Sequence, residues 1–145
     1  MSLSHSTTTG AARGYPRRMG KTPNRATYED LLALDEQTRA EVVEGRVVLL
    51  PSTTGQHQYA VGELGDALRQ LARSSPNRLS GWWILSDLDV LLAEQVILRP
   101  DLVGWRRERL ASPRGRPIDV RPDWVCEVVS PSNASHDLVT KRRLY

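Results

Sequence analysis

Cysteine is almost missing from this 145-residue sequence, which contains Cys126 alone. A single thiol excludes an internal disulfide framework and a zinc site built from several cysteines, and it fits a reducing compartment. The sequence also has no run of about 18 to 20 apolar residues that could cross a bilayer, and its N-terminus lacks the apolar segment of a secretion signal. We therefore expect a soluble cytoplasmic protein without membrane association.

Acidic residues are absent from the first 26 positions, which hold five basic side chains and carry a charge of +5. The rest of the chain is slightly acidic at −2, so the net charge of +3 comes from this tail. A solvated basic tail explains that distribution, which makes the net charge weak evidence for a DNA-binding face. Residues 1–25 show no apolar periodicity and are predicted to be disordered.

Residues 26–145 have the features of one α/β domain, in a chain that is 39% apolar and 26% charged. Thr27 and Asp30 match a capping box and predict a short helix after Thr27. Valine-rich segments at 41–43 and 46–50 flank Glu44-Gly45, which predicts a β-hairpin. Apolar residues spaced by three and four predict an amphipathic helix over 57–73; the residues of its apolar face are Val61, Leu64, Leu68 and Leu71.

The second half of the sequence predicts short strands over 82–85, 90–92 and 97–105, the last interrupted by Pro100. A loop over 106–121 and a central strand over 124–129, covered on both faces, should follow. Residues 130–133 then predict a turn, and a last helix is expected to reach Tyr145. On that helix, Leu138, Lys141 and Tyr145 share a face that should point inward.

Glu127 is the most informative residue because it is the only charged side chain in the run Trp-Val-Cys-Glu-Val-Val. A buried carboxylate is penalised by several kcal/mol unless a cation or hydrogen-bond donors meet it. This placement indicates a functional carboxylate, and the alternative is a strand-end glutamate that points to water. Asp101 follows the stiff residue Pro100 where a strand resumes, although Pro-Asp pairs are also common in turns.

Lys141 is the only lysine of the folded part, where every other basic residue is arginine, and this choice favours a site that needs a compact ammonium. The alternative is an exposed pair with Asp137, four residues earlier. Glu41 alternates with Val42 in the hairpin and could face either way. His57 lies on the apolar face of its helix, where a histidine more often packs than binds a ligand.

In chain order, these residues resemble the Uma family of restriction endonucleases in the PD-(D/E)XK nuclease superfamily. The segments that carry the resemblance are Glu41-Val42-Val43-Glu44-Gly45, His57 at a helix start, Pro100-Asp101-Leu102-Val103, Glu127-Val128-Val129-Ser130-Pro131-Ser132-Asn133, and the helix with Asp137 and Lys141 up to Tyr145. The resemblance implies a restriction-endonuclease-like fold, in which helices flank a mixed central β-sheet and an acidic site for Mg²⁺ or Mn²⁺ lies at its middle.

The resemblance also assigns roles to the matching residues. Asp101 and Glu127 would be metal ligands, and Glu41 would be an accessory carboxylate of the metal site. The superfamily's lysine normally lies two residues after the second acid, where this chain has Val129, and the resemblance places that lysine at Lys141. Relatives continue into a further strand, so we expect the sheet to lack its C-terminal strand.

Together these features predict a metal-dependent endonuclease that hydrolyses DNA phosphodiester bonds, with DNA as partner and a homodimer as one possible assembly. Asp101, Glu127, Lys141 and Glu41 would take part in catalysis, with His57 as an accessory residue. The alternative is a catalytically inactive relative that binds DNA or another partner, with the basic tail contacting phosphates. A serine hydrolase is disfavoured because no nucleophile-elbow pattern is present.

Overall fold

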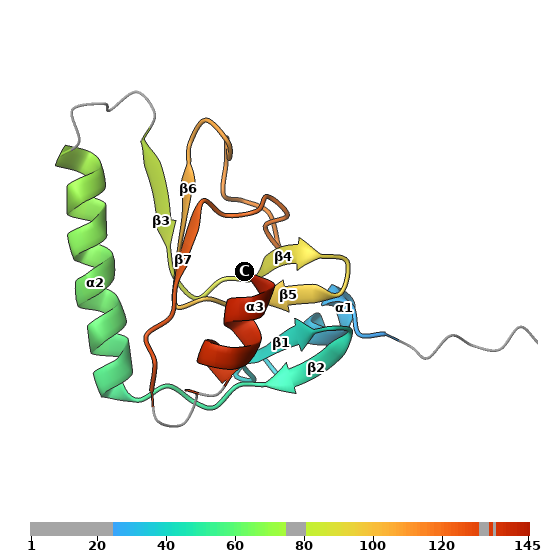
Figure 1. The fold of residues 1–145 in the computed structure, drawn as a ribbon. Coiled ribbons are helices and arrows are strands. Elements are labelled where there is room, and N and C mark those ends of the chain that lie inside the picture. Colours follow the sequence, from blue (N-terminus) through green and yellow to red (C-terminus); the bar gives the residue numbers. More distant parts are fainter. Residues whose placement is uncertain (1–24, 75–80, 131–133, 135) are drawn as a thin grey trace, which may run out of the picture.

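The computed structural model describes residues 25–74, 81–130, 134 and 136–145. The predicted disordered tail lies outside these residues except for Arg25, and the predicted turn at 130–133 lies outside them except for Ser130. The described strands form two antiparallel sheets, with strand orders β2-β1-β5-β4 and β3-β6-β7. Helix α2 stands beside the second sheet, and the C-terminal helical segment lies near the junction of the two sheets (Figure 1).

The first sheet contains the predicted hairpin. Its strands are β1 (Ala40–Val43), β2 (Arg46–Leu49), β4 (Val90–Ala93) and β5 (Val96–Leu98). At the hairpin turn, Glu44 and Gly45 have φ angles of 50° and 76°. Two positive φ values suit the twist of a two-residue hairpin, and glycine adopts the second without steric cost. This turn fixes the register that pairs Glu41 with Val48.

The second sheet continues from the first after the chain passes Pro100. Its strands are β3 (Trp82–Leu85), β6 (Leu102–Arg106) and β7 (Trp124–Cys126). The predicted α/β class is confirmed, and the interruption expected at Pro100 is the point where the sheet divides in two. Asp123 joins β7 to β6, because its carboxylate accepts the N–H of Arg106 at 2.9 Å and lies 2.9 Å from a guanidinium nitrogen of Arg109.

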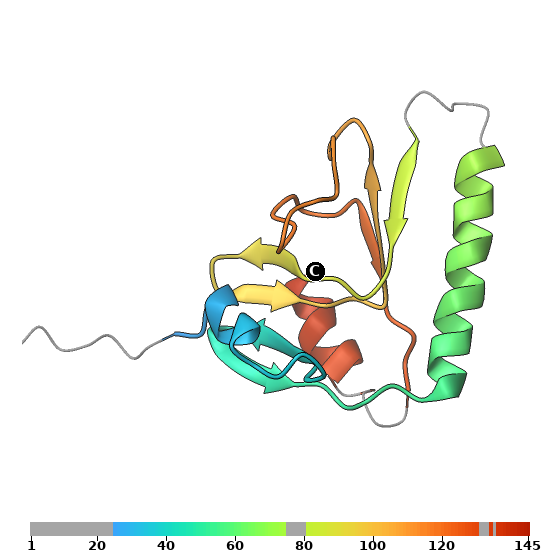
Figure 2. The same ribbon diagram turned by 180° about the vertical axis from the view of Figure 1, so that it is seen from behind.

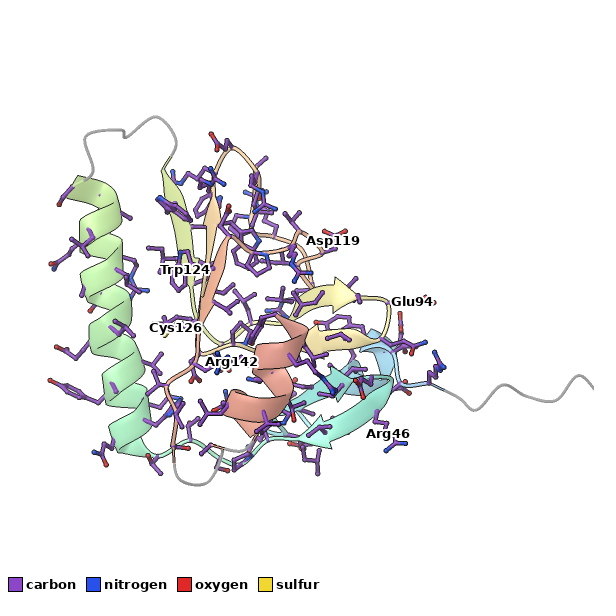
Figure 3. All side chains as sticks on the ribbon, in the orientation of Figure 1. Arg46, Glu94, Asp119, Trp124, Cys126 and Arg142 are labelled. Carbon is purple, nitrogen blue, oxygen red and sulfur yellow. The ribbon has the colours of Figure 1, made fainter. Side chains whose placement is uncertain are left out.

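Strand β7 differs from the prediction in its position. It pairs with β6 alone among the described strands, and its three residues are half-buried. The expectation of a central strand covered on both faces is therefore wrong for the part of the chain that the structure describes. On the face that carries Trp124, the indole lies directly over Gly104, where a Cβ atom would come within 2.1 Å of Nε1. Figure 3 shows Trp124 and Cys126 on β7.

The two N-terminal helices form where the sequence predicts them. Helix α1 spans Tyr28–Leu32, and the N–H of Thr27 donates to Asp30 at 2.7 Å, as a capping box requires. Helix α2 spans Gly55–Ser74. Among the described helices, none is both long and apolar enough to pass through a membrane.

Only part of the predicted apolar face of α2 packs inward. Leu64 and Leu71 are 38% and 69% exposed, whereas Val61 and Gly65 are buried. Figures 1 and 2 show that α2 runs alongside the sheet rather than across the middle of the molecule. Only a narrow stripe of the helix therefore meets the sheet, and Gly65 allows close approach because Leu102 lies 3.2 Å from the position of an added Cβ.

The last helix begins with a π-helical turn, η1 (His136–Lys141), and ends with the α-helical turn α3 (Arg142–Leu144). The prediction that Leu138 faces inward is wrong, because its side chain is 54% exposed. Asp137 and Lys141 are the residues of η1 that are buried. A π turn has more residues per turn than an α-helix, so the spacing of three and four does not locate its inner face.

The apolar core lies on the opposite face of the second sheet from Trp124. Its buried members are Val90, Val103, Trp105, Leu110 and Ile118. The indole N–H of Trp105 donates to the carbonyl of Val120 at 2.7 Å, so this large side chain is buried without an unsatisfied donor. This core holds β6 in place, and the residue before β6 is Asp101.

Candidate active site

Lys141 is the centre of a polar cluster between the two sheets. Its side chain is 2% exposed, and Nζ lies 2.9 Å from Glu41 Oε1 and 2.9 Å from Glu127 Oε1. Nζ also donates to the carbonyl of Arg99 at 3.4 Å. Burial alone would lower the pKa of Lys141, but the two carboxylates outweigh burial and raise that pKa. Lys141 is therefore a charged ammonium that joins a carboxylate of one sheet to a carboxylate of the other.

Asp101 and Glu127 lie opposite each other on neighbouring chain segments. The register pairs Leu102 with Cys126, so the next pair outward is Asp101 with Glu127. The N–H of Asp101 donates to Glu127 Oε2 at 3.2 Å, and the N–H of Val128 donates to Asp101 Oδ2 at 2.8 Å. These two bonds hold both carboxylates close together at the end of β7.

Glu41 is fully buried in β1 and meets three donors or cations. Its Oε1 accepts the N–H of Arg99 at 2.7 Å and lies 2.9 Å from Lys141. Its Oε2 lies 2.8 Å from Nε2 of His136. His136 and Lys141 are five residues apart, and the π-helical turn brings both to the same carboxylate.

His57 lies at the start of α2, where its Nε2 is 3.0 Å from Asp101 Oδ1. The side chains of His57 and Asp101 are each 11% exposed. The helix therefore turns the imidazole toward the cluster, and the contact orients one oxygen of Asp101.

Tyr145 and Asp137 complete the surroundings of Lys141. The hydroxyl of Tyr145 donates to Glu127 Oε1 at 2.5 Å, and burial together with Glu127 raises the pKa of Tyr145 far above its usual range. Asp137 Oδ1 lies 3.8 Å from Lys141 Nζ, and burial raises the pKa of Asp137. Burial also raises the pKa of Glu127, although Lys141 and Tyr145 oppose this effect.

Oxygen ligands are the donors that Mg²⁺ and Mn²⁺ prefer, and the pair Asp101 and Glu127 supplies them. The contacts described for Asp101 Oδ1, Asp101 Oδ2 and Glu127 Oε2 use one lone pair of each oxygen, so each can accept a further partner. Within the described ranges, however, no three side chains of His, Cys, Asp or Glu are arranged to hold a metal ion. Glu41 shares the ammonium of Lys141 with Glu127 and is already met by three donors.

The charges of the cluster also favour a bound cation. The ammonium of Lys141 lies near three carboxylates, those of Glu41, Glu127 and Asp137, and a fourth, that of Asp101, lies beside Glu127. Burying several negative charges around one positive charge is unfavourable, and a divalent cation would offset the excess. The residues therefore fit a cation site in which Asp101 and Glu127 would hold the ion.

A small pocket opens beside the cluster. Side chains of both signs line it, among them Arg39, Thr54, His57, Arg99, Asp101 and Lys141. Arg39 is held by Asp87 at 2.7 Å, and Arg99 is held by Asp89 at 2.9 Å. Each guanidinium has five N–H donors, so these ion pairs leave donors for an anion in the pocket.

The structure brings together all five residues that the sequence analysis selected: Glu41, His57, Asp101, Glu127 and Lys141. Sequence reasoning missed His136 and the two pocket arginines as residues of the site. It placed Tyr145 on the inward face with Lys141, but it did not predict the contact of Tyr145 with Glu127. No sequence pattern marks His136, because its contact with Glu41 spans 95 residues and depends on the π turn.

Comparisons with known proteins give the family of the chain and a similar fold. Residues 25–145 match the model of the Uma2 family, which is described as "putative restriction endonuclease". The matched region includes all the residues of the cluster. A search of curated proteins gives no match.

Among solved structures, the fold is similar to the crystal structure of a "putative nuclease belonging to DUF820" from Anabaena variabilis ATCC 29413. The TM-score is 0.60 at 20% sequence identity, and the match covers 80% of this chain. It covers 65% of the Anabaena chain, so the present chain spans slightly less than two thirds of that relative. At this identity the similarity establishes the fold.

Proposed function

The chain belongs to the Uma2 family, and from this premise we propose that it is a nuclease that hydrolyses DNA phosphodiester bonds with Mg²⁺ or Mn²⁺. We further propose that residues 26–145 form the nuclease domain, that the protein acts in the cytoplasm, and that two copies can assemble. One observation carries the proposal: the buried ammonium of Lys141 contacts Glu127 directly, beside Asp101, and borders a pocket that contains two arginines.

The pocket is suited to a phosphate group. Arg39 and Arg99 supply guanidinium donors, which form strong hydrogen bonds with phosphate oxygens. The first turn of α2 begins at Gly55 beside the pocket-lining residue Thr54, and a helix N-terminus attracts anions. These positive groups would bind a DNA phosphate next to Asp101.

A cation held by Asp101 and Glu127 would polarise the scissile phosphate and lower the pKa of a bound water molecule. Lys141 opposes the rise that burial causes in the pKa of Glu127 and holds its carboxylate in place. Its position on the pocket wall would allow it to stabilise charge that develops on phosphate oxygens. His57 orients Asp101 and lines the same pocket. Glu41 acts through Lys141, which it holds from the other sheet.

Cleavage of supercoiled plasmid in Mg²⁺ or Mn²⁺ tests the proposal. We expect Asp101→Ala and Glu127→Gln to lower the rate by about 100-fold or more, because each removes a ligand of the cation. Glu94→Gln is the matched control, since this exposed acid lies in the turn between β4 and β5 (Figure 3). Equal cleavage by wild type and all three variants would mean that a contaminating nuclease is being measured.

The second candidate is a catalytically inactive DNA-binding relative. It is favoured by the finding that every oxygen of Glu41, Asp101 and Glu127 already meets a donor within the described chain. Titration calorimetry with Mg²⁺ and Mn²⁺ separates the two candidates. Heat of binding that Asp101→Ala abolishes supports the nuclease, whereas DNA binding by folded protein that takes up neither ion supports the inactive relative.

A further inference from the structure

Residues of the C-terminal half of α2 and of the outer strand β3 line a second pocket. These two elements run side by side, away from the C-terminal helical segment that carries Lys141 (Figure 1). Arg69 and Arg73 line the pocket from the helix, and Trp82 and Trp83 line it from the strand. Arg107, just after β6, closes one side. The proposed nuclease site does not use any of these five residues.

The charge of this pocket is positive. Three arginines line it, and its described lining includes no carboxylate. Asp66 holds Arg69 at 2.7 Å, and Arg107 lies 4.1 Å from the ring centroid of Trp83. Two of the three guanidinium groups therefore have fixed positions, which reduces the entropy that binding an anion would cost.

The pocket also offers a flat aromatic surface. Trp83 is fixed, since its indole N–H donates to the carbonyl of Leu110 at 2.9 Å and its ring packs on the core. Trp82 is the preceding residue on the strand, so its side chain projects from the opposite face of the sheet. The ring of Trp82 is only partly buried and borders the same pocket as Arg69 and Arg73.

We propose that this pocket binds a single-stranded segment of DNA, with a base stacked on Trp82 and phosphates held by Arg69, Arg73 and Arg107. The proposal rests on the proposed nuclease function, which supplies DNA as the substrate class. Aromatic rings next to arginines bind single strands without sequence preference, since every base has a flat face. The competing occupant is an acidic peptide, which would pair with the positive charge of the pocket but would have no base to stack on Trp82.

The position of the pocket relates it to the proposed nuclease site. Helix α2 carries His57 at that site and Arg69 and Arg73 at this pocket. Separations of 12 and 16 residues along an α-helix correspond to about 18 to 24 Å. Stacked nucleotides rise about 3.4 Å each, so about five to seven nucleotides would span that length. The pocket would therefore hold the strand to one side of the cleaved bond.

Binding of a fluorescein-labelled 12-nucleotide oligothymidylate to the full chain, measured by anisotropy in EDTA, tests the proposal without cleavage. We expect Trp82→Leu to raise the Kd by about 5- to 150-fold, which is the usual effect of losing one stacked base. Trp82→Phe keeps an aromatic ring, so its Kd should rise less than that of Trp82→Leu. Arg73→Ala should weaken binding and reduce the slope of log K against log salt by about 0.7.

Arg46→Ala is the matched control, since Arg46 is an exposed arginine on β2 in the other sheet (Figure 3). Wild-type affinity and salt slope in both Trp82→Leu and Arg73→Ala would overturn the proposal. Displacement of the oligonucleotide by polyglutamate of equal charge at equal concentration would overturn it in favour of an acidic chain. A protein that binds through Trp82 but leaves plasmid uncut would refute the nuclease and leave this pocket as a DNA site.

Discussion

Replacing Lys141 by methionine should destabilise the fold more than any surface change on the same helix. The side chain is 2% exposed, and its Nζ lies 2.9 Å from both Glu41 and Glu127. Methionine fills a similar space but leaves two buried carboxylates without their shared cation. Removing one partner of a buried ion pair typically costs about 3 to 5 kcal/mol of unfolding free energy.

The loss of stability in Lys141→Met should increase with pH. Burial raises the pKa of Glu127 above its ordinary value of 4.5, and Lys141 opposes this effect. Without Lys141 that pKa should rise further, so the folded variant would bind more protons than the unfolded chain over a wider range above pH 4.5. Stability falls with increasing pH wherever the folded state holds more protons. The stability of the variant relative to wild type should therefore be lowest at neutral and higher pH.

Urea unfolding followed by circular dichroism at about pH 5 and about pH 8 measures both effects, since stability falls linearly with denaturant. Arg142→Met is the matched control, because Arg142 is the exposed next residue (Figure 3) and surface changes usually stay within about 0.5 kcal/mol. The double variant Lys141→Met, Glu127→Gln should lose less unfolding free energy than the sum of the losses in the two single variants. A Lys141→Met protein as stable as the Arg142→Met control at both pH values would refute the reasoning.

Two further predictions concern the second sheet. Burial opposes ionisation of Asp123, but the N–H and guanidinium groups of its two arginine partners outweigh it and lower its pKa below 3.8. Asp123→Asn should lower the free energy of unfolding by about 1.5 to 3 kcal/mol at pH 7, measured by urea unfolding. The difference in stability between wild type and variant should shrink as pH falls through the lowered pKa of Asp123. A difference in stability that does not change with pH would contradict this. Gly104→Ala should cost about 1 to 3 kcal/mol in the same assay because its Cβ would meet Trp124 at 2.1 Å, whereas the control Gly62→Ala on α2 has open space and should be neutral or stabilising.

Several parts of the fold follow from local sequence alone. The capping box of Thr27 and Asp30 sets the start of α1, and Glu44-Gly45 sets the hairpin turn, since both depend on neighbouring residues. Glu127 and Lys141 could also be recognised from the sequence. A lone acid in an apolar run and a lone lysine among arginines are residue choices that packing by itself does not favour.

Other features depend on contacts that only the folded chain makes. The stripe of α2 that is buried was decided by its place alongside the sheet, which left Leu64 and Leu71 exposed. The inner face of the last helix was decided by its π turn, which local periodicity does not reveal.

The sequence by itself determined which side chains form the proposed site, because their types are costly to bury without a purpose. Tertiary structure decided which of them meet: His136 reaches Glu41 across 95 residues, and Lys141 reaches two sheets at once. Such contacts arise when distant segments pack together, and their geometry is a property of the whole fold rather than of any segment.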